Sequence, residues 1–232
     1  MSGRRGVVRT GPSTGKCIGL LGGSFNPAHG GHRRISLFFR DKLGLEEVWW
    51  LVSPGNPLKT AKDMAPVASR FASARHHARR APIRVTAIER QLGTRYTVDT
   101  LRKLLRRYPK RRFVWLMGAD NLAQFGTWRD WRGIARLLPI AVVARPGYDG
   151  AALASPAMAW LRRFRTSVAS LCNRAGWSAP ALITLRFDPD SRSATQIRRA
   201  DPLWPRRYPL TGLRDAVTHR SIHRDPAAME PS

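Results

Sequence analysis

Short apolar runs alternate along this chain with stretches in which apolar side chains recur every three or four residues. The runs, which are typical of buried strands, occupy residues 17–21, 48–52, 83–87, 113–117, 140–144 and 182–187. The stretches of helical periodicity begin near Gly30, Pro66, Thr97 and Ala194, and one more surrounds Trp160. Strands that alternate with helices predict an α/β fold, in which a doubly wound parallel sheet carries helices on both faces.

That architecture is Rossmann-like, and its ligands bind outside the carboxyl ends of the strands. Candidate chemistry is therefore expected in the segments that follow each apolar run. Two helix ends carry more specific expectations. The hydroxyl of Thr97 is expected to cap the helix that follows it, and the chain after Ala194 is helix-capable to about His219.

Length and composition predict one packed domain. The chain has 232 residues, of which 43% are hydrophobic, so it needs no disulfide or metal staples. We expect the domain over residues 16–220, a flexible basic extension over residues 1–15 and a frayed tail over residues 221–232. Two cysteines, Cys17 and Cys172, exclude a disulfide framework. No apolar run approaches the roughly 18 residues of a membrane helix. The basic N-terminus has no apolar signal region, so we expect a cytoplasmic protein without a membrane partner.

Basic side chains outnumber acidic ones by 41 to 15, which gives a formal net charge of +26. The excess is densest over residues 60–112, where 15 basic and 3 acidic side chains give a net charge of +12. Such an excess favours anionic partners, and nucleic acid, a membrane surface and a phosphorylated metabolite all fit it. No nucleic-acid-binding module accompanies the charge, so a basic nucleic-acid-binding protein is the alternative from a different function class.

The most informative segment is GGSFNPAHGGH, residues 22–32, directly after the first strand. Gly22 and Gly23 let main-chain N–H groups approach an anion closely. His29 and His32 are three residues apart, which puts both imidazoles on one face at the start of a helix. That position, beside the positive end of the helix dipole, suits phosphate oxygens. A metal site is not indicated, because no third ligand accompanies the histidines.

A second anion site is indicated near the C-terminus. Ser193 and Gln196 have the spacing of a capping box, which predicts a helix start with available N–H groups. Arg198 lies one turn into that helix and can reach an anion bound there. By contrast, the segment from Gly11 to Lys16 is not a phosphate-binding P-loop, because it is too short between its glycines and precedes a strand.

Together the two motifs resemble the signatures of the HxGH nucleotidyltransferases. The first motif matches the adenylyl-transferring members at Gly22, Gly23, Ser24, Phe25, Asn26, Pro27, His29, Gly31 and His32. The second motif matches at Ser193, Thr195, Ile197 and Arg198. Residues 53–59, 96–101, 118–131 and 143–148 extend the resemblance to bacterial nicotinate-nucleotide adenylyltransferases, from about residue 16 to about residue 213.

The resemblance implies transfer of the adenylyl group of ATP to nicotinate mononucleotide, giving deamido-NAD and pyrophosphate, with Mg²⁺ carried by ATP. It implies direct in-line attack without a covalent intermediate. The residues it implies for catalysis are His29, His32, Lys59 and Arg198. Those implied for ATP binding are Gly22, Gly23, Ser24, Phe25, His29, His32, Ser193, Thr195 and Arg198. Those implied for nicotinate mononucleotide are Asn56, Lys59, Tyr96, Thr97, Asp120, Trp128, Arg129 and Arg145.

Within that last set, the resemblance implies that the nicotinate ring stacks on Trp128, and that its carboxylate meets the main-chain N–H groups of Thr97 and Arg129. The nucleophile is a phosphate monoester, already anionic at neutral pH, so no general base is required. Adenylyl transfer to nicotinamide mononucleotide or to phosphopantetheine remains the alternative among enzymes. Trp131 is expected in the core, and Asp99, His76 and His77 are expected on the surface.

Overall fold

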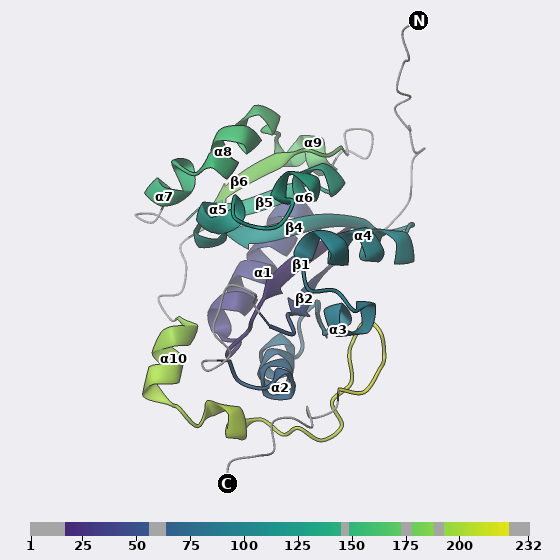
Figure 1. Ribbon diagram of the computed structural model, residues 1–232, viewed down its shortest axis with the longest axis vertical. Helices are drawn as coiled ribbons and strands as arrows, with labels where there is room; N and C mark the ends of the chain where they lie inside the picture. Colours follow the sequence, from purple (N-terminus) through teal and green to yellow (C-terminus); the bar gives the residue numbers. More distant parts are fainter. Residues whose placement is uncertain (1–16, 56–63, 145–148, 173–177, 188–192, 223–232) are drawn as a thin grey trace, which may run out of the picture.

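A computed structural model describes residues 17–55, 64–144, 149–172, 178–187 and 193–222. Six strands form one parallel sheet in the order β3-β2-β1-β4-β5-β6. They are β1 (Cys17–Gly23), β2 (Glu47–Val52), β3 (Ile83–Thr86), β4 (Arg112–Gly118), β5 (Ile140–Ala144) and β6 (Leu182–Arg186). The first strand, β1, lies at the centre of the sheet, and β2 and β3 follow it toward one edge. The chain then returns to the other side of β1, where β4, β5 and β6 follow toward the opposite edge (Figure 1). The predicted doubly wound, Rossmann-like sheet is therefore confirmed.

Helices cover both faces of the sheet. One face carries α1 (Gly30–Leu43), α2 (Val67–Ala78) and α9 (Val168–Cys172). The other carries α3 (Ile88–Leu92), α4 (Thr97–Arg107), α5 (Ala119–Phe125), α6 (Trp131–Leu137), α7 (Asp149–Leu153) and α8 (Pro156–Leu161), the last followed by the 3-10 turn η2 (Arg162–Phe164). Side chains alternate along each strand, so Trp50 lies in the first core and its neighbour Trp49 in the second.

The helix expected from Gly30 is α1, and it buries Phe39 and Leu43. It also buries a polar residue, Ser36. The Ser36 hydroxyl donates to the main-chain oxygen of His32 at 2.7 Å and accepts from the indole N–H of Trp50 at 2.8 Å. The buried hydroxyl therefore both donates and accepts a hydrogen bond, which is how a polar group is tolerated in a core.

The predicted helix to about His219 is wrong. After α10 (Ala194–Ala200) the chain forms a 3-10 turn, η4 (Trp204–Arg207), and then runs without a helix below α2 toward α3 (Figure 1). Pro209 lacks an N–H donor, and Gly212 has a left-handed φ of +61°. The N–H of Ala216 donates to the carbonyl of Val85 at 3.0 Å, so this segment covers the exposed edge of β3.

A buried carboxylate fastens that segment to the sheet. Asp215 is 1% exposed and accepts from the Thr86 hydroxyl at 2.9 Å and the N–H of Ala87 at 2.8 Å. It also accepts from the N–H groups of Val217 and Thr218, each at 2.9 Å. These four hydrogen bonds offset the cost of burying the carboxylate, and the bonds from Thr86 and Ala87 connect the chain beyond α10 to the end of β3.

Candidate active site

The turn after β1 lies at the centre of the carboxyl edge of the sheet, since β1 pairs with β2 on one side and β4 on the other. The order of the strands reverses between β1 and β4, which is where open α/β sheets bind ligands. Gly22 packs directly on Trp115 of β4. A Cβ atom at Gly22 would lie 2.6 Å from Cη2 of that ring, so glycine alone allows this approach.

Phe25 anchors the turn in the core. Its φ of +48° lies in the left-handed region, which is unusual for a residue with a side chain. The ring is 1% exposed and stacks on Trp50 at a centroid distance of 5.0 Å. It also lies 5.0 Å from the imidazole of His32. The buried ring thus holds a strained turn and supports one of the two predicted site histidines.

The two histidines form a reciprocal cap at the start of α1. His29 is the N-cap, and its Nδ1 accepts from the N–H of Gly31 at 3.1 Å. Nδ1 of His32 accepts from the N–H of His29 at 3.2 Å. Because both Nδ1 atoms are acceptors, each neutral ring carries its proton on Nε2. The ring centroids are 4.0 Å apart, so the two imidazoles lie side by side at a helix N-terminus, a position that favours phosphate oxygens.

Helix α10 brings the second motif to the same turn. Ser193 and Gln196 form the predicted capping box, with hydrogen bonds of 3.2 and 2.9 Å. Nη1 of Arg198 donates to the main-chain oxygen of Asn26 at 2.6 Å, and Nη2 donates to the Thr195 hydroxyl at 3.2 Å. The first of these bonds joins residues 172 positions apart in the sequence. A guanidinium has five N–H donors, so these two bonds leave capacity for an anion.

Four residues expected to bind nicotinate mononucleotide lie on the opposite face of the sheet, near the start of α4. Trp128 is half-buried and meets Trp115 edge-on at 6.2 Å. Trp115 also packs on Gly22, so it connects this group to the first motif. The guanidinium of Arg129 lies 4.5 Å above the ring of Tyr96, a cation–π contact that holds both side chains beside the helix start.

The prediction that Thr97 caps α4 is wrong. The helix begins at Thr97, and its N-cap is Tyr96, whose side chain makes no capping hydrogen bond. The N–H groups of Asp99 and Thr100 bond to the carbonyl of Tyr96, each at 3.1 Å. Tyr96 therefore offers no side-chain acceptor to the N–H groups of the first turn, whose positive end favours an anionic ligand.

The remaining described residues fall as follows. Asp120 is exposed in the first turn of α5, with its carboxylate against Gly118. Trp131 is 9% exposed and packs in the core, as predicted. Asp99 forms an ion pair with Arg102 at 3.4 Å on the surface, as predicted.

Three of the predicted residues, Asn56, Lys59 and Arg145, lie outside the described residues, and their roles stay predictions.

The histidine pair on α2 was expected on the surface. His76 is exposed, and His77 is partly exposed. Neither contributes to the carboxyl edge of the sheet, because both lie in the last turn of α2.

Sequence reasoning missed Arg70, which is fully buried on α2 and donates to the carbonyl oxygen of Ser24 in the turn after β1. A signal was present. Arg70 occupies the apolar face of its helix, three residues after Val67 and four before Ala74, both of which are buried. A charged residue on a core-facing stripe requires polar partners from elsewhere in the fold.

One carboxyl group near this edge has a shifted pKa. Glu89 lies in α3, directly after β3. Burial raises the pKa of its carboxyl from 4.5 to about 7, against the smaller opposing effects of a hydrogen bond from Thr100 and the positive charge of Arg70. The group therefore titrates near neutral pH.

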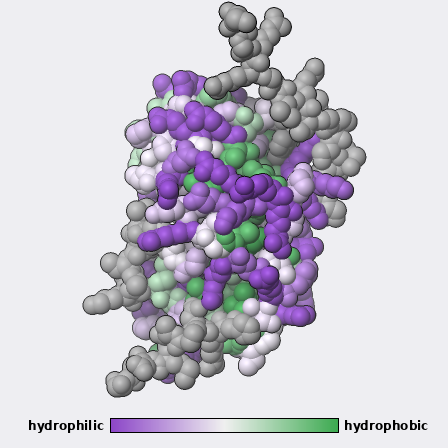
Figure 2. Space-filling model, turned by 45° about the vertical axis from the view of Figure 1, so that its right-hand side comes forward, coloured by the Kyte–Doolittle hydropathy of each residue, from purple (hydrophilic) through white to green (hydrophobic). Residues whose placement is uncertain are grey.

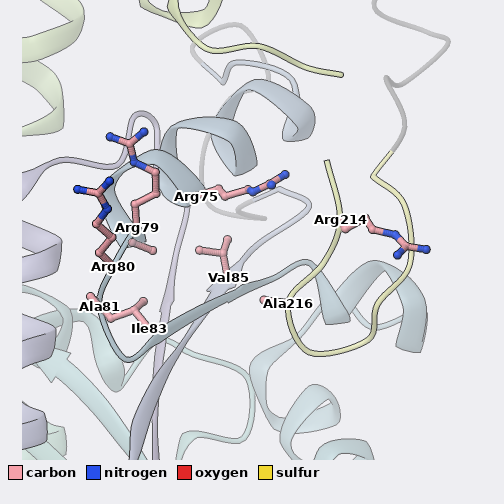
Figure 3. A pocket seen from close by; sticks show the side chains of 9 residues that line it. Arg75, Arg79, Arg80, Ala81, Ile83, Val85, Arg214 and Ala216 are labelled. Carbon is pink, nitrogen blue, oxygen red and sulfur yellow. The ribbon is translucent and has the colours of Figure 1, made fainter. Parts of the chain in front are cut away.

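A cavity of about 240 Å³ lies away from this edge, at the end of α2 and the start of β3. Its floor is apolar, formed by residues that include Ala81 and Ile83, and four arginines surround it. Their guanidinium groups diverge, with Arg79 and Arg80 on one side and Arg214 on the other (Figure 3). Divergent cations do not form an anion site. The cavity is also separated from the motifs by the length of α2.

Most basic side chains of the described residues lie on the surface, and the buried Arg70 is an exception. The exposed positions of α4 include Arg102, Lys103, Arg106 and Arg107. Figure 2 brings that side of the molecule forward, and hydrophilic side chains cover much of it with hydrophobic surface between them. Across the described ranges, no three His, Cys, Asp or Glu side chains group to hold a metal ion. None of the helices the structure describes is long and apolar enough to cross a membrane.

Known proteins match this chain over most of its length. Residues 20–200 match the sequence model of the family described as cytidylyltransferase-like. A protein of Erythrobacter litoralis, called "Probable nicotinate-nucleotide adenylyltransferase", is 72% identical over 212 residues, which cover 90% of this chain and 97% of that protein. A protein of Bradyrhizobium sp. with the same name is 49% identical over 187 residues, which cover 81% of this chain and 97% of that protein.

Solved structures share the fold. A Plasmodium falciparum nicotinic acid mononucleotide adenylyltransferase complexed with NaAD matches with a TM-score of 0.58 and 14% identity, over 79% of this chain and 83% of that one. The same enzyme complexed with APC matches with a TM-score of 0.55. The resemblance inferred from the two motifs is thus confirmed by independent comparisons. The chain belongs to the cytidylyltransferase-like family and, within it, to the nicotinate-nucleotide adenylyltransferases.

Proposed function

We propose that this protein transfers the adenylyl group of ATP to nicotinate mononucleotide, giving deamido-NAD and pyrophosphate in NAD biosynthesis. The observation that carries the proposal is the contact between the two motifs, in which Arg198 of α10 reaches the turn that leads into His29 and His32. Residues far apart in the chain thereby surround one point at the carboxyl edge of the sheet. The substrate assignments of the relatives agree with it.

The phosphate of nicotinate mononucleotide is the nucleophile. One of its oxygens forms a bond to the α-phosphorus of ATP, and the bond from that phosphorus to the oxygen bridging the α- and β-phosphates breaks. Pyrophosphate leaves with that oxygen, so charge builds up on the leaving group and on the α-phosphate oxygens. The enzyme's contribution is to position the two substrates and to stabilise this charge.

Each motif has a part in that stabilisation. The Nε2–H groups of His29 and His32 donate to phosphate oxygens, with their orientation fixed by the reciprocal cap. ATP lies against Gly22 and Gly23 at the end of β1 and against Ser24 and Phe25 in the turn that follows. Ser193, Thr195 and Arg198 bind the triphosphate from α10, and Lys59 is assigned to the same charge. Adenylyl transfer of this kind uses a divalent metal that arrives with ATP, and we propose Mg²⁺ as that part of the substrate.

The acceptor is recognised at the start of α4. Trp128 stacks on the pyridine ring, and the main-chain N–H groups of Thr97 and Arg129 bind the carboxylate of nicotinate. The uncapped start of α4 supports this assignment. Tyr96, Asp120, Asn56 and Arg145 complete the acceptor site in the proposal.

The proposal extends to the organisation of the chain. Residues 16–220 form the single catalytic domain, preceded by a basic extension over residues 1–15 and followed by a tail over residues 221–232. A cytoplasmic location would bring the enzyme together with its substrate ATP. The basic surface is assigned no nucleic-acid partner.

The proposal is tested by incubating the full chain with MgATP and nicotinate mononucleotide and measuring pyrophosphate together with the dinucleotide product. Each substrate is omitted in turn, and phosphopantetheine is offered as a second acceptor. Pyrophosphate and deamido-NAD in equal amounts, only when both substrates are present, are expected. Faster turnover of phosphopantetheine would contradict the assignment. No turnover, together with tight oligonucleotide binding that weakens steeply with salt, would favour a nucleic-acid-binding protein instead.

A further inference from the structure

Arg70 connects three segments around the candidate site while remaining fully buried itself. Its Nη1 donates to the carbonyl oxygens of Ser24 at 2.6 Å and Ser53 at 2.8 Å. Its Nη2 donates to Pro54 at 3.1 Å, and its Nε donates to Ala65 at 2.8 Å. Ser24 begins the turn after β1, Ser53 and Pro54 follow β2, and Ala65 precedes α2. One side chain therefore ties the carboxyl ends of two neighbouring strands to the start of a helix.

The chemistry of arginine suits this task. Removing a charge from water destabilises the fold unless polar groups surround that charge. The planar guanidinium offers five donors in a fixed fork, so it can bind carbonyl oxygens from several directions at once. Packing alone would favour an apolar residue, because Phe71 and Ala74 beside it on α2 are buried apolar residues.

The turn that Arg70 holds is strained. Phe25 has a left-handed φ of +48°, a conformation that is unfavourable for a residue with a side chain and persists only where the surroundings impose it. Arg70 binds the carbonyl of Ser24, directly before Phe25, at 2.6 Å. Arg198 binds the carbonyl of Asn26, directly after it, at 2.6 Å. Two arginines from different helices thus bind the carbonyl groups of the residues before and after the strained one.

Helix α2 holds the far end of the turn as well. The Ser73 hydroxyl accepts from the N–H of Ala28 at 3.1 Å and donates to the carbonyl of Arg70 at 2.9 Å. Ser73 is 0% exposed, so no solvent competes for these bonds. Ala28 directly precedes the N-cap, His29. Consequently the path from Ser24 to the first histidine is fixed to α2 at both ends.

We propose that Arg70 is a positioning residue for adenylyl transfer, which holds the turn after β1 in the geometry that the phosphates of ATP require. It acts through the turn, because a fully buried side chain cannot touch the substrate. The inference rests on the proposed function. Substitution of Arg70 should lower the rate strongly although its side chain does not contact the substrate, because a displacement of about 1 Å in a catalytic group can lower the rate about a hundredfold.

The test compares Arg70→Lys with a variant that loses stability elsewhere. Lysine keeps the charge and most of the volume, but its single ammonium group cannot reach carbonyls on three segments. Leu171→Ala on α9 is the control, because Leu171 is 2% exposed in the same core and lies far from the turn in the chain. Steady-state pyrophosphate release gives kcat and the KM values for both substrates, at a temperature where circular dichroism shows each variant folded.

We expect kcat of Arg70→Lys to fall by about tenfold to a hundredfold. The KM values for ATP and nicotinate mononucleotide should change far less, because the groups that contact both substrates remain. Leu171→Ala should lower the melting temperature at least as much yet keep kcat near that of the wild type. This split between kcat and stability is what a merely structural role would not produce.

Ser73→Ala is the second variant, and it keeps the test decisive if Arg70→Lys does not fold. Loss of the hydroxyl leaves the N–H of Ala28 without this acceptor, so kcat should fall several-fold with the same small effect on KM. Wild-type kcat in Ser73→Ala, or a kcat of Arg70→Lys no lower than that of Leu171→Ala, would overturn the inference. A wild-type chain that releases no pyrophosphate would contradict the proposed function itself, which is a separate outcome.

Discussion

His29 has two tasks that substitution can separate. Its Nδ1 caps α1 by accepting from the N–H of Gly31 at 3.1 Å, and its Nε2–H is assigned to the phosphates of ATP. Asparagine carries its Oδ1 at the position of Nδ1 and is among the best N-cap residues, but it has no group at the position of Nε2. His29→Asn therefore removes the phosphate donor and keeps the cap, whereas His29→Ala removes both.

The size of each effect follows from the contact that is lost. Loss of an N-cap costs about 1 kcal/mol, which for a chain of this length lowers the melting temperature by about 2–4 °C. Loss of one donor to the developing charge costs about a hundredfold to a thousandfold in kcat. His29→Ala should show both losses. His29→Asn should show the loss in kcat alone, with kcat and kcat/KM lowered together.

The assay is pyrophosphate release at saturating ATP and nicotinate mononucleotide, paired with thermal unfolding of the same samples. His76→Asn provides a control, because His76 is an exposed histidine in the last turn of α2. Near-wild-type kcat in His29→Asn would show that the Nε2–H of His29 takes no part in the reaction. An equal melting temperature for His29→Ala and the wild type would show that the cap contributes nothing.

Three further predictions follow from the same geometry. Arg198→Ala should raise the KM for ATP by about tenfold to a hundredfold, because charge-assisted hydrogen bonds to ATP are lost, and should change the KM for nicotinate mononucleotide much less. The control is Arg199→Ala, which changes an exposed neighbouring residue. Equal losses of affinity for both substrates would point to a structural role. Gly22→Ala should lower the free energy of unfolding by about 1–3 kcal/mol through overpacking, because its Cβ would lie 2.6 Å from Cη2 of Trp115. Adding Trp115→Phe should recover part of that free energy, as measured by urea unfolding. Additive losses of stability in the double variant would refute the contact. The pKa of Glu89 is 4.5 in the unfolded chain and about 7 in the folded protein, so between these pH values the folded state alone holds the proton. The free energy of unfolding should therefore fall by about 3 kcal/mol as the pH rises from 4.5 to 7. Glu89→Gln should reduce this pH dependence of the free energy of unfolding, and an unchanged dependence would contradict the shifted pKa.

The fold could be predicted from the sequence where the periodicity is long and local. The strands and the helices from Gly30, Pro66 and Thr97 agree with the structure to within one or two residues. The short helices α3, α5 and α6 were missed, because five to seven residues are too few to display a helical period. The chain after α10 has a composition that favours a helix. Tertiary contacts override this preference, because Asp215 accepts hydrogen bonds from residues at the end of β3.

The candidate site could be predicted only as far as its motifs. The glycines, the histidines and the capping box at Ser193 were visible as local patterns, and the resemblance joined them. Their geometry was not visible, because the cap between His29 and His32 depends on side-chain orientation. Arg70 could not be assigned a role from sequence, since its partners Ser24 and Ser53 come from two separate loops.

The most direct test of the central claim compares two acceptors that differ in one group. Nicotinate mononucleotide carries a carboxylate where nicotinamide mononucleotide carries a neutral amide. Main-chain donors at Thr97 and Arg129 should favour the charged acceptor by about 1.5–3 kcal/mol, or roughly tenfold to a hundredfold in kcat/KM. The measurement is the ratio of kcat/KM values at the same MgATP concentration. A preference of that size for the acid is predicted, and equal values or a preference for the amide would contradict the account.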